Sequence, residues 1–478
     1  MTTKYWEPYS PTPDEPWDLR RVVHLHKRAG FASTWGEIQR DLADGPEASV
    51  TRLLAGKPRA VGVPPDFEQT AGLLAEAAVA SRDISRLKAW WIYRMLFSPD
   101  PLAERLTLMW HNHFATSNLK VDDPVAMRRQ NDVFREFGHA PFGELLRRVV
   151  RDPAVLIWLD APANRKEHPN ENLARELMEL FSIGVGHYSE TDVKEAARAL
   201  TGWTVTSKGE FSEAAGRHDG GEKTIFGKNG PWSGDELVQM LLDHPATSTR
   251  LAFRVCEMFM AEETAVSGVA EAPAQRSPGE RESALPRAAV ESLADGLRVR
   301  NLDIGWAVET VLRSRLFFSD RNIAGRVPGP AEFVVGSARA LELFDPAPST
   351  LLLAEWVTRL GQDLFYPPNV FGWPGGRSWV TTRSINVRVK FAAALVGGAL
   401  RNPAVPFDAL ALAMRQGRGD DLTTAIAFYC ELLLGNAKGA VVDEIQAAML
   451  RPAANETLEE QVRHAVATIL SRPEAELG

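Results

Sequence analysis

The chain has 478 residues, of which 45% are hydrophobic and 24% charged, and its formal net charge is -8. This composition is that of a folded globular protein, with enough chain for one large domain or for two or three smaller ones. An acidic balance without a basic cluster argues against nucleic acid as the main ligand. The two cysteines, Cys256 and Cys430, stand far apart in apolar surroundings, which predicts buried thiols rather than a disulfide.

The sequence also bears on location and on the division of the chain. No run approaches 18 apolar residues, so no membrane span is expected. The N-terminus lacks the apolar segment of a secretion signal, which predicts a cytoplasmic protein for the chain as given. We expect an irregular arm over residues 1–20, rich in proline and tryptophan, a main helical domain over 21–400 and a C-terminal helical part over 401–478.

The segment after Pro101, PLAERLTLMWHNHFATSN, has the apolar spacing of a helix and carries two histidines near its end, His111 and His113. Residues two apart on a regular helix point in directions about 200° apart. A metal ion shared by both imidazoles would therefore require the last turn to unwind around Asn112.

Residues 170–203 predict a helical hairpin. Leucine and phenylalanine recur at helical spacing up to Ser182, and glycines follow at 184 and 186, where a helix can end in the left-handed conformation. Ser189 and Asp192 predict a capping box for the second helix. The spacing places Glu176 and Glu179 at the edge of the apolar face of the first helix.

Carboxylates and histidines that project from packed helices suit a divalent metal ion. The metal hypothesis uses His111, His113, Glu176 and His218 as ligands of a divalent ion of unknown identity, with Glu176, Glu179 and Arg377 as catalytic residues. The spacing is not Glu-x-x-His on either helix. The structural alternative is that Glu176, Glu179 and Glu195 form ion pairs with Arg175, Arg198 and other arginines. An Arg175–Glu179 pair at i, i+4 would be one of these.

Three segments depart from the helical pattern. Short alternating pieces over 204–227 predict a small β-hairpin, which could be the lid or wall of a pocket. Residues 263–288 have the composition of an exposed insertion. Residues 361–380 combine prolines and glycines with aromatic side chains, which predicts an ordered, packed loop.

The loop over 361–380 is also a candidate ligand site, since stacked aromatics beside Arg377 and Asn369 could hold a sugar or an anion. The candidate ligand-binding residues are Trp203, Asn369, Trp373 and Trp379. The alternative is that the loop only fills the core between helices.

Five segments resemble the bacterial domain of unknown function 1800 family, in the same order. They are HLHKRAGFAS (24–33), ERLTLMWHNHFATS (104–117), the hairpin at 170–203, HDGGEKTIFG (218–227) and GQDLFYPPNVFGWPGGRSWV (361–380). Proteins similar to these are often encoded beside a second family, domain of unknown function 1501, which resembles phosphatases and sulfatases and is usually exported. The resemblance therefore implies a partner of that kind, and an envelope or polysaccharide setting.

These observations predict a mainly α fold, a large helical domain with a small β-hairpin insertion. Three functions stay open. The first is a metal-dependent enzyme with a histidine and carboxylate site between helices, linked to polysaccharide metabolism. The second is a non-catalytic module that binds a carbohydrate ligand or the partner protein. The third is a structural subunit in which the polar residues organise helix packing.

Overall fold

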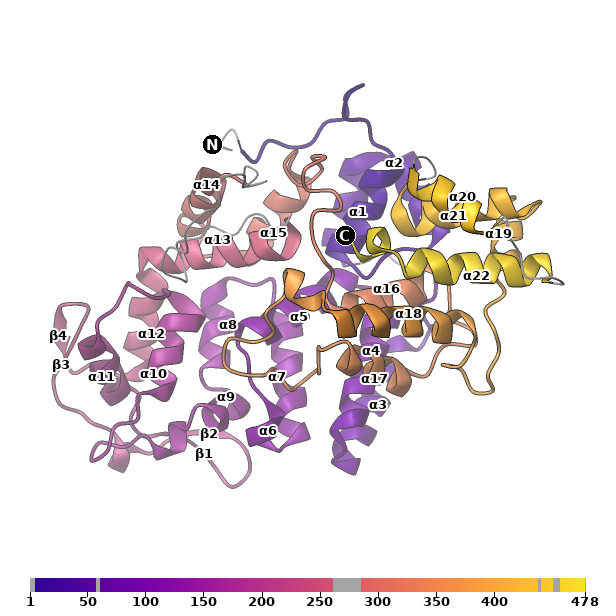
Figure 1. The fold of residues 1–478 in the computed structure, drawn as a ribbon. Coiled ribbons are helices and arrows are strands. Elements are labelled where there is room, and N and C mark those ends of the chain that lie inside the picture. The colour runs from indigo at the N-terminus through magenta and orange to yellow at the C-terminus, as the bar shows by residue number, and fades with distance from the viewer. Residues whose placement is uncertain (1–4, 57–60, 261–284, 437–439, 450–455, 478) are drawn as a thin grey trace.

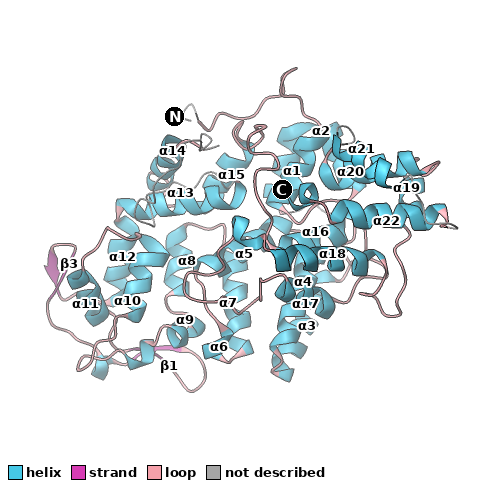
Figure 2. Cartoon of the chain, in the orientation of Figure 1, coloured by secondary structure: helices cyan, strands magenta, loops and turns pink. Residues whose placement is uncertain are grey.

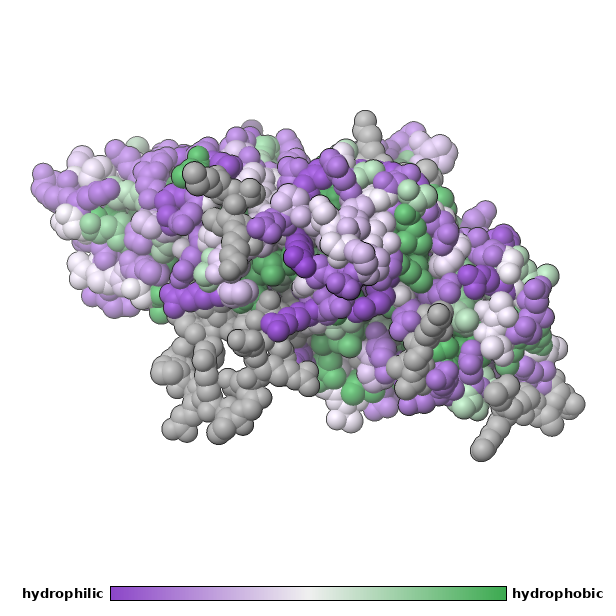
Figure 3. All heavy atoms as spheres, turned by 90° about the horizontal axis from the view of Figure 1, so that it is seen from above, coloured by the Kyte–Doolittle hydropathy of each residue, from purple (hydrophilic) through white to green (hydrophobic). Residues whose placement is uncertain are grey.

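The structure is a computed structural model, and it describes residues 5–56, 61–260, 285–436, 440–449 and 456–477. Helices make up most of it, and the few strands lie at one edge of the molecule (Figure 2). The predicted mainly α fold is therefore confirmed. Within the described residues, none of the helices combines the length and apolar character needed to span a bilayer. The face in Figure 3 is largely hydrophilic, with hydrophobic patches between polar areas.

The described residues of the first third of the chain are mostly helical. Most of these helices begin at an aspartate, serine or threonine whose side chain accepts a hydrogen bond from the first turn, and three have proline at their start. They are α1 (Leu19–Ala29), α2 (Trp35–Leu54), α3 (Phe67–Ser81), α4 (Ile84–Phe97), α5 (Pro101–His113), α6 (Asn118–Val121), α7 (Pro124–Phe137), α8 (Phe142–Val149) and α9 (Pro153–Trp158).

The arm that precedes α1 is irregular where it is described, but it is packed. Trp6 and Tyr9 are buried, and the Tyr9 amide donates to the Arg313 carbonyl at 2.8 Å. His24 and His26 on α1 are both buried. Helix α1 is buried on nearly all sides because it contributes to both cores of the protein.

In the described residues between 170 and 313, the predicted helical hairpin is followed by further helices. These elements are α10 (Asn172–Glu176), a π-helix (Leu177–Ser182), α11 (Glu190–Ala199), α12 (Gly234–Asp243), α13 (Pro245–Phe259), α14 (Arg287–Arg298) and α15 (Ile304–Arg313). The segment predicted as an exposed insertion, 263–288, lies mostly outside the described residues. At its described end, Leu285 is buried and α14 begins at Arg287.

Residues 203–230 form two small antiparallel hairpins. Strand β1 (Trp203–Val205) pairs with β2 (Phe211–Glu213), and β3 (Lys223–Ile225) pairs with β4 (Lys228–Gly230). The two segments predicted near residues 204 and 223 are therefore strands β1 and β3, and each pairs with the strand that follows it in sequence. The second hairpin closes through Phe226 and Gly227, both at positive φ, which is the tight turn that matches strand twist.

The last third of the chain is again helical. Its helices are α16 (Pro330–Ala340), α17 (Thr350–Arg359), α18 (Thr382–Val396), α19 (Ala409–Arg415), α20 (Leu422–Leu434), α21 (Ala440–Met449) and α22 (Leu458–Leu470). Helix α22 packs against α18 and α20, and α20 packs against α1. The C-terminal helices therefore share a core with the N-terminal ones.

The buried residues form two large hydrophobic cores. One gathers α8 to α15 at the left of Figure 1, and the other gathers α3, α4 and α16 to α22 at the right. Helix α5 contributes leucines to both, Leu106 to the first and Leu108 to the second. The last turn of α5, which carries the two histidines, therefore lies at the junction of the two cores.

Candidate functional site

Helix α5 keeps its regular form through both histidines. Asp100 caps its start by accepting from the Ala103 amide at 3.0 Å, and the helix continues to His113. Because the last turn does not unwind around Asn112, the imidazoles of His111 and His113 point away from each other. The condition for a metal ion shared by these two histidines is not met.

His111 lies in a closed aromatic cage. Its ring is fully buried, and ring centroids of Trp91, Phe365 and Trp373 lie 5.2, 5.3 and 5.7 Å away. Neither ring nitrogen has a hydrogen-bond partner. Burial lowers the pKa of His111 to about 3, so the imidazole is neutral at ordinary pH.

His113 faces a different environment. Its Nε2 lies 3.2 Å from the Phe181 carbonyl, and its side chain lines a pocket together with Glu179, Arg250 and Arg254. Burial, followed by the charges of Arg254 and Arg250, lowers the pKa of His113 well below its usual value. Of the predicted site residues, the structure therefore places His113 and Glu179 in the same pocket.

The central hairpin has a feature that apolar spacing did not indicate. After α10 the backbone widens into the π-helix, and the hairpin then ends through Gly184 at φ +83°. The predicted Arg175–Glu179 pair is wrong, since Arg175 pairs with Glu171 at 3.1 Å and with Glu190 at 2.8 Å. Pairs at i, i+4 are neighbours only in a regular α-helix, and single π turns are often found at functional sites.

The carboxylates of the hairpin divide into two groups. Glu179 accepts a hydrogen bond from the Tyr188 hydroxyl at 2.5 Å, and Glu176 beside it is half-buried. Burial, and then the charge of Glu179, raises the pKa of Glu176 to about 7. Asp192 and Glu195 instead accept backbone N–H groups of the β3 hairpin, at 2.7 and 3.1 Å. Only the first pair adjoins the pocket at His113.

Two arginines from α13, which sequence reasoning did not select, complete this pocket. Arg254 pairs with Glu257 at 2.7 Å. Arg250 is only 8% exposed; its Nη2 donates to the Leu180 carbonyl at 3.4 Å, and its Nε has no partner. Among the described residues, no carboxylate forms an ion pair with Arg250. Two arginines four apart in the otherwise apolar stretch RLAFRVCEMF were the available signal.

The pocket at His113 is joined to a larger one, and we call the two together the cleft. The cavities have volumes of about 280 and 410 Å³, and Phe253, Arg254, Glu257 and Phe371 line both. The larger cavity lies between α5, α13, the start of α16 and the loop over 371–379. The cleft therefore sits where the two cores meet.

The predicted aromatic loop forms one wall of the cleft. Trp373 and Trp379 are 4% and 7% exposed, whereas Phe371 is 62% exposed. Asn112 of α5 holds the loop, because its Oδ1 accepts from the Trp373 amide at 2.7 Å. Gly372, at φ +81°, makes this approach possible, since a Cβ there would lie 2.2 Å from Asn112 Oδ1.

The inner end of the larger cavity contains a buried charge network. The Glu332 carboxylate pairs with Arg105 of α5 and, at 2.8 Å, with Arg326. Burial alone would raise the pKa of Glu332, but the two guanidinium groups lower it to about 2. This carboxylate is therefore ionised at any ordinary pH.

The remaining predicted site residues lie elsewhere. The His218 ring nitrogen Nδ1 lies 2.9 Å from the Thr201 carbonyl, and Trp203 is buried against Phe211. Arg377 is exposed and lines neither cavity, and the Asn369 side chain accepts from the Phe371 amide at 2.9 Å to shape the loop. Nor does the stretch 204–227 line the cleft.

The described side chains do not assemble the predicted metal site. No three histidine, cysteine, aspartate or glutamate side chains in the described part of the chain are grouped closely enough to hold a metal ion. Of the four predicted ligands, only His113 lines the cleft, and His111 and His218 lie outside it. Metal binding stays a prediction, and no step below depends on it.

The chain belongs to the family described as "Protein of unknown function (DUF1800)", whose model matches residues 24–477. The resemblance expected from the five sequence segments is thus confirmed over nearly the whole chain. No curated protein and no solved structure matches it.

Proposed function

We propose that the chain binds an acidic oligosaccharide in the cleft, with Arg250 and Arg254 as anchors for an anionic group of the sugar. The observation that carries the proposal is the buried guanidinium of Arg250. It lines the cleft, yet no described carboxylate forms an ion pair with it. Glu257 and Glu179 stabilise this charge only from beyond ion-pair distance, so an anionic ligand in direct contact with Arg250 would recover free energy that the protein alone does not.

The second support is the placement of Arg254 next to Arg250. The two guanidinium groups come from adjacent turns of α13, and both line the cavity at His113. Burial, and then the charge of Arg254, lowers the pKa of Arg250 to about 10. Guanidinium forks bind carboxylate, sulfate and phosphate oxygens in pairs.

The third support is Phe371, which lines both cavities of the cleft. Its ring is 62% exposed, although a large apolar side chain is usually buried, and the Asn112 contact holds the loop that carries it. An exposed aromatic ring on a rigid loop can pack against the apolar face of a sugar ring. Because the two cavities are joined at Phe371, the cleft suits a ligand of more than one sugar unit.

Catalysis is a second candidate function of the same site, favoured by the pair Glu176 and Glu179. A carboxyl group with a pKa near 7 can hold a proton at neutral pH and give it to a leaving oxygen. Glu179 lines the cleft and Glu176 lies beside it. A phosphatase- or sulfatase-like partner of the domain of unknown function 1501 family, expected from the resemblance, would act on the anionic groups that Arg250 is proposed to hold.

The binding test uses three soluble polymers: polygalacturonate, dextran sulfate and neutral dextran. Affinity electrophoresis or calorimetry at fixed salt should show binding to at least one acidic polymer and none to dextran. Arg250→Gln should weaken that binding about tenfold or more, the loss expected when one charge-assisted contact is removed. Arg287→Gln, an exposed arginine paired with Glu291 on α14, is the matched control. Equal binding by the Arg250→Gln protein, or binding to none of the polymers, would contradict the proposal.

A second variant separates the aromatic surface from the charge. Phe371→Ala should weaken binding by about threefold to tenfold, the range of one aromatic contact, and leave the melting temperature unchanged, since the ring is exposed. Trp373→Ala is less informative because that ring is buried and its loss should destabilise the fold. If Phe371→Ala binds as the native protein does, the ligand does not use this loop.

A further inference from the structure

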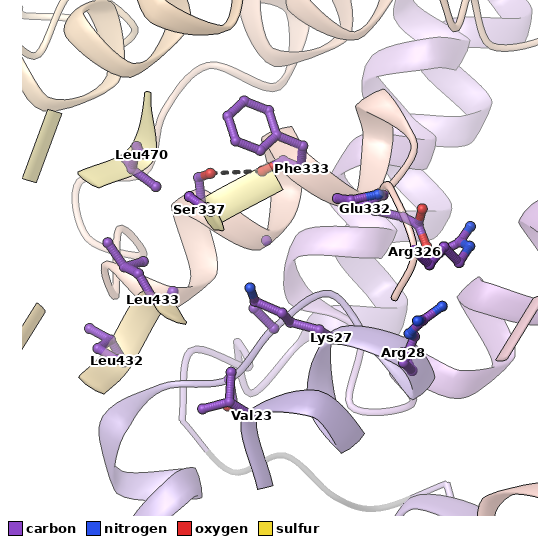
Figure 4. Close-up of a pocket in the computed structure, with 16 residues that line it drawn as sticks. Val23, Lys27, Arg28, Arg326, Glu332, Phe333, Ser337, Leu432, Leu433 and Leu470 are labelled. Atoms are coloured by element: carbon purple, nitrogen blue, oxygen red, sulfur yellow. Dashed lines mark hydrogen bonds and ion pairs between the residues drawn. The ribbon is translucent and has the colours of Figure 1, made fainter. Parts of the chain in front are cut away.

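A second cavity lies behind the cleft, enclosed by α1, α16, α20 and the residues around the end of α22. Its volume is about 60 Å³. Figure 4 shows its wall, with Val23 from α1, Phe333 from α16, Leu432 and Leu433 from α20, and Leu470 from α22. We call it the Lys27 cavity, because one lysine of α1 enters this largely apolar space.

The Lys27 side chain reaches from α1 toward Ser337 and Leu433 (Figure 4). Its amine donates to the Leu477 carbonyl at 2.9 Å. Among the described residues, no carboxylate forms an ion pair with it. Burial, and then the charge of Arg28, lowers the pKa of Lys27 to about 8, so most of the amine is still protonated at pH 7. An ammonium ion in such a space lacks the counterion that would stabilise it.

The other charges around the cavity do not supply this counterion. Three cationic side chains line it, Lys27, Arg28 and Arg326, against the single carboxylate of Glu332. That carboxylate is held by Arg105 and Arg326 on the side that also borders the cleft. The charged groups other than Lys27 therefore lie together at one end of the cavity, and the rest of its lining is largely apolar (Figure 4).

The size of the cavity limits its occupant. A cavity of about 150 Å³ in another protein holds benzene, so a space of about 60 Å³ accepts a smaller molecule. The occupant must carry one negative charge for Lys27 and a short apolar body for the leucines. We propose that the Lys27 cavity binds a short aliphatic carboxylate, with the carboxylate beside the Lys27 ammonium and the alkyl chain against Leu432, Leu433 and Leu470.

This site is distinct from the cleft, although the two share a wall. Arg326 and Glu332 line both cavities, and the Arg105 contact holds Glu332 between them. The inference does not depend on the proposed oligosaccharide, because the residues that hold the short carboxylate are not those that face the sugar. Arg250→Gln should therefore leave carboxylate binding unchanged.

The test is calorimetric titration of the full chain with sodium propionate at pH 7, with propionamide as the uncharged analogue of the same shape. Propionate has fewer heavy atoms than benzene, as the size of the cavity requires. Propionate should bind and propionamide should bind at least about tenfold more weakly, because only propionate neutralises the ammonium. Binding should weaken as the pH rises above 8 and Lys27 loses its proton. Glu332 keeps its charge over this range because its pKa is lowered to about 2, and guanidinium groups such as those of Arg28 and Arg326 stay protonated there.

Two variants assign the binding to this cavity. Lys27→Met keeps the length of the side chain without its charge and should abolish propionate binding, whereas the control Lys390→Met, at an exposed lysine of α18, should not. Ala340→Leu fills the cavity, keeps Lys27, and should also abolish binding, which covers the case of a Lys27→Met protein that does not fold. Propionate binding that survives Lys27→Met or Ala340→Leu, equal binding of propionamide, or no propionate binding to the native chain would overturn the proposal.

Discussion

Helix α5 carries a buried charge network on each of two faces, and the networks differ in what surrounds them. On the closed face, Glu104 is fully buried and accepts from Arg94 at 2.8 Å, from Arg135 at 2.7 Å and from Trp91 at 3.2 Å. On the cleft face, Arg105 forms an ion pair with Glu332, and Glu332 forms a second ion pair with Arg326. One carboxylate between two guanidinium groups is thus found on both faces.

This difference separates structural charges from candidate ligand anchors. Both Glu104 oxygens are used, and the carboxylate itself lines none of the cavities found among the described residues, although Arg94 and Arg135 line an open surface pocket. The network therefore joins α4, α5 and α7 and, through Glu68, also α3. Around the cleft, Arg250 has no carboxylate partner among the described residues, and beyond the shared wall Lys27 has none either. A buried charge that forms an ion pair within the protein has a structural role, whereas a buried charge without such a pair indicates a place where a ligand of opposite charge can bind.

Loss of the Glu104 charge should destabilise the protein most. Glu104→Gln leaves Arg94 with only the exposed Glu68, and Arg135 with only the exposed Asp132, as carboxylate partners. This should lower the free energy of unfolding by about 3–5 kcal/mol. Urea unfolding at pH 7 measures this. Glu459→Gln, whose carboxylate forms an exposed i, i+4 pair with Arg463, is the control and should cost less than about 1 kcal/mol. A small loss for Glu104→Gln would mean that the closed face is not the more rigid one.

Glu332→Gln tests the cleft face with the same substitution. We expect a smaller loss, about 2–3 kcal/mol, because water in the cleft can solvate Arg326 once its partner is neutral. The pKa of Glu332 is lowered to about 2, so this carboxylate stabilises the fold above its unfolded pKa of 4.5, and the contribution is lost as the pH falls toward 2. The two proteins should therefore become equally stable near pH 2, as acid titration of the unfolding free energy would show.

His111 can be tested separately from His113, because His111 lies in the aromatic cage whereas His113 lines the cleft. His111→Phe replaces two unpaired buried ring nitrogens by carbon and should stabilise the protein by about 1 kcal/mol at pH 7. Because the folded pKa is lowered to about 3, the native protein loses stability as the pH falls below 6.5, and the variant should not share that loss. Thermal melts from pH 4 to 7 measure both effects. Destabilisation at every pH would mean that the cage has no room for the larger ring.

Local patterns in the sequence predicted much of the fold but only part of the site. The Ser189–Asp192 capping box, the helix start at Pro101 and the glycines that end the central hairpin depend on neighbours in sequence, and all are present. The small hairpin expected over 204–227 is present, and the structure adds a second one, because two short turns within the same stretch give each strand a nearer partner.

The arrangement of the site could not be predicted because it depends on which helices meet. The sequence pattern correctly indicated His113, Glu179 and Trp373 as candidate site residues, and all three line the cleft. It also selected His111, whose burial in an aromatic cage follows from the packing of Phe365 and Trp373 from the distant loop. Arg250 was missed because its lack of a carboxylate partner is visible only in three dimensions.

The smallest expected effect is at Glu176, and it separates the catalytic candidate from a purely structural role. The raised pKa means that the folded protein loses stability as the pH rises from 4.5 through 7, since the buried group must then ionise. Glu176→Gln should therefore stabilise the protein above pH 7 and have no effect below 4.5. The gain should be less than about 1 kcal/mol, because the half-exposed side chain is screened by water. Melting curves at pH 4 and 8 measure it, and Glu171→Gln, which loses the Arg175 pair instead, should show no gain at pH 8. If Glu176→Gln lowers the melting temperature at pH 8, the carboxylate is ionised and held by a partner, and its role as a proton donor at neutral pH is lost.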